Sequence, residues 1–281
     1  MQINPTRSWS INFFREWFPR MGVISAIRFR SYIIRERGGQ LRGDLLITLR
    51  MKSPIRGKVS LREVGPDFAT FDEIVAHEVY RPVIERIKNF QTVIDLGANI
   101  GLASLYFASC SPSCRIFAVE PHPGSYGLLE RNLHDLIAAG RCRTLNAAVW
   151  ATGTMLVASS ELPADRYSGF AVHAPSLEEN GLANIQGLDI SSILQHSGFE
   201  SVDILKVDIE GAEQQLFSGD LGWLERIKAI AIEFHGAARR NIKFDDIMAS
   251  YGFQISEGRH TLLAWRTPES NAQRLGQTSI G

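Results

Sequence analysis

From Thr92 onward, the sequence alternates between short stretches rich in β-branched residues and longer stretches with helical spacing. Strands that alternate with helices in this way form a mostly parallel sheet with helices on both faces. A closing antiparallel hairpin is expected over 253–258 and 261–266, around Arg259 and His260. The other expected strands are 92–97, 115–121, 141–149, 203–210 and 227–235, and the expected helices are 101–110, 124–140, 212–224 and 244–252.

Nearly every one of these strands ends on a polar or acidic residue. The residues in question are Asp95, Glu120, Asn146, Asp208 and Glu233. Ligands of an open α/β sheet bind outside the carboxyl ends of the strands, where the strand order reverses. The sequence therefore predicts a ligand site at this edge.

The part of the chain before Thr92 has a different composition. Residues 1–58 hold twelve Lys/Arg against three Asp/Glu, whereas the whole chain has a formal charge of zero. Residues 1–43 show helical spacing interrupted at Pro19, and 44–52 is expected to be a strand. Residues 70–89 are expected to be helical, with Pro82 in a break between two short helices or in a first turn. We expect a basic, aromatic-rich extension over 1–60, a main domain over 61–268 and a flexible tail over 269–281.

Four roles are open for this basic, aromatic-rich extension. It can pack on the sheet, cover the acceptor site as a lid, form a dimer face, or lie on an anionic membrane. The zero net charge does not suggest nucleic acid as a partner. Three cysteines without a metal-binding spacing, and no stretch approaching about 20 apolar residues, favour a soluble, cytoplasmic protein, with peripheral membrane contact left open. The oligomeric state is not indicated.

The segment "TVIDLGANIG", residues 92–101, ends a buried strand on Asp95 and continues into a glycine turn. It lacks the lysine of a mononucleotide phosphate loop, and it has G-x-x-x-G in place of the dinucleotide spacing. Glu120 follows Asp95 by 25 residues, where an acid can accept both hydroxyls of a ribose. S-Adenosylmethionine meets these requirements, since it combines a ribose, an amino-acid portion and a sulfonium. A purely structural turn is the alternative.

Five motifs in order, "VIDLGANIG", "VEPHP", "NAAV", "DILKVDIEGAE" and "IAIEFH", resemble the FkbM family of S-adenosylmethionine-dependent methyltransferases. The resemblance covers about residues 60 to 265. It implies a class I methyltransferase (Rossmann-like) fold, with a mostly parallel seven-stranded sheet and a C-terminal antiparallel hairpin. The residues it implies for cofactor binding are Asp95, Gly97, Ala98, Asn99, Gly101, Glu120, Pro121, Asn146, Ala147 and Asp208.

Methyl transfer to oxygen needs alignment of donor and acceptor and a base for the hydroxyl proton. The candidates are Asp208, Glu210, Glu233 and His235, paired by the "DIE" and "EFH" spacings if both strands continue that far. His235 has an ordinary pKa suited to a base at neutral pH. The same four side chains can hold a divalent metal ion, although no metal is predicted. In the third interpretation, Glu210 caps a helix and His235 only packs.

The favoured function is O-methylation of a hydroxyl on a glycan, glycolipid or secondary metabolite, a substrate class that comes from the resemblance alone. N-methylation of a small-molecule or sugar amine is the close rival. A nicotinamide-dependent oxidoreductase and a non-catalytic binding module are more distant rivals. The acceptor is thus expected to be a small molecule or a carbohydrate. Residues 150–195, where "ISSIL" replaces the family's usual "LDDLL", are left unassigned.

Overall fold

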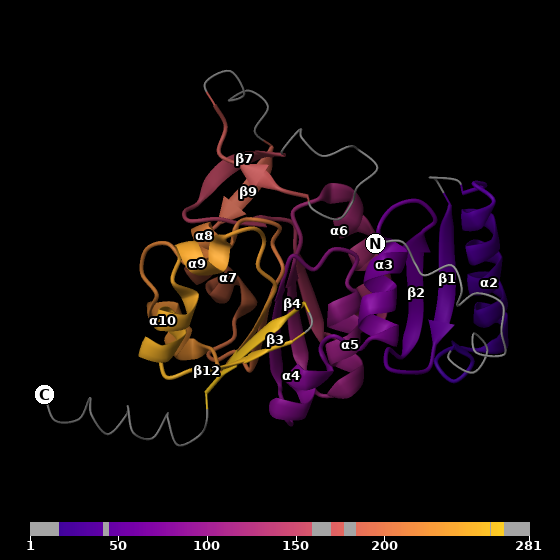
Figure 1. The fold of residues 1–281 in the computed structure, drawn as a ribbon, viewed down its shortest axis with the longest axis horizontal. Coiled ribbons are helices and arrows are strands. Elements are labelled where there is room, and N and C mark those ends of the chain that lie inside the picture. Colours follow the sequence, from indigo (N-terminus) through magenta and orange to yellow (C-terminus); the bar gives the residue numbers. More distant parts are fainter. Residues whose placement is uncertain (1–16, 42–44, 159–169, 177–183, 259, 267–281) are drawn as a thin grey trace, which may run out of the picture.

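The computed structural model describes residues 17–41, 45–158, 170–176, 184–258 and 260–266. The helix expected over 1–16, the hairpin turn at Arg259 and the tail over 269–281 lie outside these ranges. The described chain is an α/β structure in which a central sheet lies between helices, with a smaller N-terminal layer at one side (Figure 1). None of the described helices combines the length and apolar character that a bilayer crossing requires.

The main sheet has seven strands and matches the predicted topology. All of its strands are parallel except the seventh along the chain, which is antiparallel to both of its neighbours. In sheet order the strands are β12 (Gln254–Glu257), β13 (Leu262–Trp265), β11 (Ala229–Ile232), β10 (Ile204–Val207), β3 (Thr92–Leu96), β4 (Arg115–Val119) and β5 (Cys142–Leu145). The strand order reverses between β3 and β10, so the crevice expected for a ligand opens there.

Both faces of this sheet are covered by apolar side chains, which is why its strands are continuous apolar runs. Along β3, Val93 packs into the cluster on one face and Ile94 into the cluster on the other. The first face is covered by α5 (Leu102–Cys110) and α6 (Pro123–Ala138). The second face is covered by α7 (Ile190–Ser197), α8 (Glu213–Leu216) and α10 (Phe244–Ser250).

The strand expected over 141–149 is two strands in different sheets, so this prediction is wrong in its extent. β5 ends at Leu145, and β6 (Ala148–Val149) begins a small second sheet with β9 (Ile185–Leu188), β7 (Thr154–Ala158) and β8 (Val172–His173). The chain leaves the main sheet at Asn146, whose amide donates to the carbonyls of Glu120 and Pro121. These hydrogen bonds hold the chain beside the carboxyl end of β4 where it leaves the main sheet.

The helix expected over 212–224 is also shorter than predicted. It comprises α8 and a separate 3-10 helix, η4 (Gly222–Arg226). Gly219 lies between them with φ +80°, a left-handed conformation that interrupts the helix. A further short helix, α9 (Ala238–Asn241), precedes α10.

In the N-terminal layer, α2 (Val23–Arg37) packs on a hairpin of β1 (Leu46–Met51) and β2 (Gly57–Arg62). β2 crosses the domain boundary predicted at residue 60. Phe29 of α2 contacts Phe68 and Phe71 of α3 (Asp67–Phe71), and all three belong to the core cluster that contains α5. The extension therefore shares the hydrophobic core of the main domain.

The segment after β2 is helical from Asp67, three residues earlier than expected. α3 continues as a π-helix, η2 (Asp72–Ala76), and α4 (Arg81–Arg86) follows with Pro82 in its first turn, as predicted. A π-helical turn is rare in proteins and is frequent at functional sites.

A buried ion pair connects β2 to α3. Arg62 donates to both carboxylate oxygens of Asp67, at 2.7 and 3.0 Å, and also to Ser125 of α6. Asp67 accepts in addition from the backbone N–H of Arg62. Both charged side chains are almost fully excluded from solvent. The pair therefore holds the N-terminal layer against the main domain.

We predict that Asp67→Ala lowers the free energy of unfolding by about 3–5 kcal/mol, because it removes the carboxylate that pairs with the buried guanidinium of Arg62. Urea unfolding of the full chain measures this change. The control is Glu85→Ala, which removes the exposed i,i+4 partner of Arg81 and is expected to leave the midpoint nearly unchanged. Equal shifts in the two variants would contradict the role of the Arg62–Asp67 pair.

Candidate active site

The loop between β3 and α5 is a tight turn at the point where the sheet order reverses. Gly97, Asn99 and Gly101 have φ values of +71°, +49° and +85°, so three of its residues are left-handed. A Cβ atom on Gly97 would lie 1.7 Å from the carbonyl oxygen of Asp208. Glycine is therefore required here by close backbone approach as well as by conformation.

A buried lysine holds this glycine loop. The ammonium of Lys206, on β10, donates to the carbonyls of Leu96 and Gly97 at 3.2 and 2.6 Å. It lies 3.1 Å from the carboxylate of Asp95, which also accepts from Ser104. Burial opposes the charge on Lys206, but the carboxylate of Asp95 outweighs it and raises the lysine pKa. Asp95 and Lys206 thus form a charged link between β3 and β10.

Glu120 follows β4 and faces the same crevice. Its carboxylate accepts from the backbone N–H groups of Asn99 and His122, at 2.7 and 2.8 Å. Burial raises the pKa of Glu120 to about 7, although these two hydrogen bonds act in the opposite direction. Glu120 therefore connects the second strand end to the glycine loop and can gain or lose a proton near neutral pH.

Two cavities meet at this loop, and Gly97, Asn99 and Asp208 line both. The first cavity extends from Glu120 toward the small second sheet. Its remaining lining residues are Pro121, Ala147, Ala148, Val149, Phe170, Val172, Ile209, Glu210 and Ala212. It joins a carboxylate at one end to a largely apolar wall, a combination suited to a ribose and a flat ring.

The second cavity has a volume of about 250 Å³ and lies on the other side of the glycine loop. The segment from Pro66 to Tyr80 forms one wall, including Thr70 and Glu73, and the carboxyl ends of β10 and β11 form another. Besides Lys206, four carboxylates line it: Glu73, Asp208, Glu210 and Glu233. Burial, followed by the nearby Asp208 carboxylate, raises the pKa of Glu233 to about 7.

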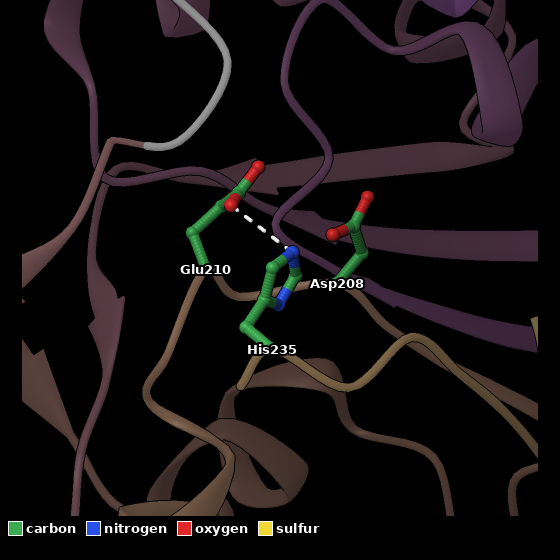
Figure 2. Close-up of side chains that lie close together, drawn as sticks. All are labelled: Asp208, Glu210 and His235. Carbon is green, nitrogen blue, oxygen red and sulfur yellow. Dashed lines mark ion pairs between the residues drawn. The ribbon is translucent and has the colours of Figure 1, made fainter. Parts of the chain in front are cut away.

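His235 lies between Glu210 and Glu213 at the edge of this site, and Figure 2 shows its contact with Glu210. Its Nε2 is 3.1 Å from Glu210, and its Nδ1 is 2.9 Å from the fully buried Glu213. The hydrogen bond to Glu213 is the largest influence, and it raises the pKa of His235 to about 9. The imidazole is therefore protonated at neutral pH.

Asp208, Glu210 and His235 each offer a ligand atom within 4.8 Å of the others, so the chain can bring three metal-binding groups together. Figure 2 shows the three side chains converging from the ends of β10 and β11. Strand alternation does not produce this arrangement. β10 ends at Val207 and β11 at Ile232, and Glu210 has a left-handed φ of +48°. The expectation that both strands continue through these residues is wrong.

The structure separates the sequence-predicted cofactor residues into two groups. Gly97, Ala98, Asn99, Glu120, Pro121, Ala147 and Asp208 line one or both cavities. Among the described residues, Asp95, Gly101 and Asn146 do not line either cavity. Asp95 pairs with Lys206. Gly101, the residue before α5, lies close to the side chain of Leu133 on α6. Asn146 donates to the carbonyl of Glu120 and so holds the chain near it.

Several residues of the site were not identified from the sequence. Glu213 lies within the motif "DIEGAE", but nothing in its spacing indicates that it contacts a histidine 22 residues later. Tyr80 and Glu73 come from the N-terminal side of the glycine loop, and Phe170 comes from the unassigned region. Only the tertiary fold brings these segments to the cavities.

The profile of the family described as "Methyltransferase FkbM domain" matches residues 95–255. The chain is 28% identical over 195 residues to the methyltransferase sdnD of Sordaria araneosa, which covers 59% of this chain and 75% of that protein. It is 24% identical over 159 residues to hexuronic acid methyltransferase AglP of Haloferax volcanii, with 56% and 62% covered. It is 23% identical over 249 residues to 31-O-demethyl-FK506 methyltransferase FkbM of Streptomyces tacrolimicus, with 79% and 94% covered.

Solved structures also match this fold. One is a methyltransferase FkbM from Methylobacillus flagellatus KT, with a TM-score of 0.46 and 16% sequence identity. The match covers 63% of this chain and 44% of that chain.

We predict that Glu213→Gln lowers the pKa of His235 from about 9 toward 6.5, because the imidazolium loses its main hydrogen-bond acceptor. The raised pKa also implies a pH-dependent stability. The contribution of the charged His235 is fully present below pH 6.5 and is lost as the pH rises through about 9. NMR titration of the imidazole C–H signals measures the pKa directly.

The control for this titration is Glu200→Gln. Glu200 is an exposed glutamate, and its substitution is expected to leave the His235 pKa unchanged. Glu210→Gln is expected to produce a smaller fall than Glu213→Gln. An unchanged His235 pKa in folded Glu213→Gln protein would contradict the assignment of Glu213 as the main cause.

Proposed function

Because the chain belongs to the FkbM family of S-adenosylmethionine-dependent methyltransferases, we propose that it methylates a hydroxyl group of a carbohydrate, glycolipid or secondary metabolite. The observation that carries this proposal is Glu233, a carboxylate beside the second cavity with a pKa near 7. Relatives named for methylating a hexuronic acid and the 31-O position of an FK506 precursor support a sugar or small-molecule hydroxyl.

The residues of the first cavity fit S-adenosylmethionine. The ionised Glu120 can accept the two ribose hydroxyls, and the wall from Ala147 to Val149 can receive the adenine. Among the described residues, the buried side-chain oxygen of Asn99 has no hydrogen-bond partner, so it can accept one from the ligand. The absence of a side chain at Gly97 leaves room for close approach. When bound, this cofactor supplies an electrophilic methyl group on a sulfonium.

In the second cavity, the acceptor hydroxyl must lose a proton as its oxygen attacks the methyl group. Glu233 can take that proton, because a base with a pKa near the working pH is the most effective one. Asp208 lines both cavities and can orient the groups that meet there. The Pro66–Tyr80 segment forms one wall of this cavity.

His235 has a different role in this proposal from the one suggested by its ordinary pKa. With a pKa near 9 it is already protonated at neutral pH and cannot accept the hydroxyl proton. Its charge instead offsets that of Glu210 and Glu213. We therefore assign the base to Glu233 and an orienting role to His235 and Glu210.

A divalent metal ion at Asp208, Glu210 and His235 is the alternative use of this group. The hydrogen bond from His235 to the buried Glu213 resembles the carboxylate contact that orients a metal-binding histidine. Metal binding would require His235 to release its proton. N-methylation is the second alternative, since the carboxylates of the second cavity favour a cationic amine.

We predict that the full chain binds S-adenosylmethionine and that Glu120→Gln binds it about tenfold more weakly or worse. The variant loses charge-assisted hydrogen bonds of about 1.5–3 kcal/mol. Wild-type affinity should rise with pH through about 7, because deprotonation yields the carboxylate that accepts the hydroxyls. Isothermal titration at several pH values measures both effects.

The control for Glu120 is Glu130→Gln, an exposed substitution on α6 that is expected to bind like the wild type at every pH. A parallel titration with NAD⁺ tests the oxidoreductase alternative. Tight binding of NAD⁺ without binding of S-adenosylmethionine would overturn the proposed function.

We predict that Glu233→Gln lowers kcat by about 10²–10⁴-fold while S-adenosylmethionine affinity stays within about twofold of wild type, because only proton transfer is removed. The wild-type rate should rise with pH through about 7, and this rise should be absent in the variant. Incorporation of labelled methyl groups into hexuronic acid glycosides and small-molecule alcohols provides the assay.

Chelation by EDTA followed by metal add-back separates the two mechanisms at the second cavity. Under the proposal, the wild-type rate is the same before and after chelation. A rate that is lost with EDTA and restored by a divalent metal would favour the metal mechanism over Glu233. Incorporation into amines alone would favour N-methylation.

A further inference from the structure

Helix α2 is apolar on two opposite faces. Its inner face contributes Ala26, Phe29 and Tyr32, which are buried against the hairpin and α3. Its outer face exposes Ile24 and Ile27, which are 69% and 59% accessible to solvent. An ordinary surface helix has one apolar face, so the second apolar face requires its own explanation.

The exposed apolar residues of α2 lie on one side of the helix. At 3.6 residues per turn, Val23, Ile24, Ile27 and Ile34 lie within about 100° of one another on the helix. These four residues are the outer stripe of α2. Figure 1 shows α2 as the outermost labelled helix of the N-terminal layer, with β1 and β2 between it and the main domain.

Arginines border this outer stripe on both sides. By helical position Arg28 lies along one edge and Arg30 along the other, and both are exposed. Arg28 also donates to the carbonyl of Thr48 on β1, which keeps its guanidinium at the edge of the helix. When an apolar stripe is buried in an apolar phase, long basic side chains beside it can extend so that their charged ends stay in the polar phase.

The hairpin that packs against α2 also exposes basic side chains. Arg50, Lys52, Arg56 and Lys58 of the hairpin region are all exposed, and residues 1–58 carry nine more basic than acidic residues, twelve against three. A second copy of this chain would bring the same arginines against one another across a two-fold axis. An anionic lipid surface instead accepts the stripe among its acyl chains and the arginines among its phosphates.

From these features we propose that the outer stripe of α2 docks the protein on an anionic membrane surface, with the helix parallel to the bilayer plane. The stripe enters the boundary between headgroups and acyl chains, and Arg28 and Arg30 contact the headgroup phosphates. The catalytic cavities lie elsewhere, at the carboxyl ends of the main strands, so this surface can be changed without altering them.

Vesicle flotation of the full chain tests this docking. The vesicles contain phosphatidylcholine either alone or mixed with phosphatidylglycerol. We expect wild-type protein to float with the mixed vesicles only, and less so as salt is raised. Ile24→Gln/Ile27→Gln and Arg28→Gln/Arg30→Gln should each bind the mixed vesicles about tenfold more weakly or worse. The first pair removes apolar burial and the second removes charge.

The matched control is Met155→Gln on β7, which changes an exposed apolar side chain of 46% accessibility far from α2 in sequence and should float like the wild type. Thermal unfolding and S-adenosylmethionine titration check that each variant keeps its fold and cofactor site. Three results would overturn the proposal. They are no flotation of the wild type, equal flotation of all variants, and a wild-type dimer that dissociates in Ile24→Gln/Ile27→Gln without any lipid effect.

Discussion

The buried ammonium of Lys206 is the contact on which the whole candidate active site depends. It links β10 to the end of β3 through Asp95 and the carbonyl of Gly97, at the one place where the sheet order reverses. Since Gly97 and Asn99 line both cavities, the position of this loop determines the shape of each. A buried charge is stable only with such partners, so the loop and the lysine require each other.

The carboxylates around this loop have the same chemistry but different surroundings, and their surroundings separate their roles. Burial brings Glu120 and Glu233 to a pKa near 7, one beside each cavity. Glu213 is fully buried and pairs with His235, whose charge it stabilises. One of these acids thus faces the proposed cofactor, one the proposed acceptor, and one a neighbouring cation. Because all three are glutamates, their different surroundings account for their different roles.

The N-terminal layer both packs on the main domain and exposes an apolar surface. Phe29 and Phe68 make it continuous with the core beneath the main sheet, and the segment that follows Asp67 reaches the second cavity. The same layer leaves the outer stripe of α2 uncovered by its hairpin. A surface that contacts a membrane would therefore be joined through one hydrophobic core to a wall of the proposed acceptor site.

The sequence by itself determined the sheet and its glycine loop, because the pattern of apolar strands and the glycine turn are local signals. Periodicity predicted the alternation of strands and helices from Thr92 and the closing hairpin. The place of Glu120 at the end of its strand predicted an acid beside the ligand crevice, and the motifs indicated the family. The tertiary structure alone decided which carboxylate we propose as the base. The pKa values of Glu233 and His235 depend on burial and on Asp208 and Glu213, contacts that no spacing along the chain reveals.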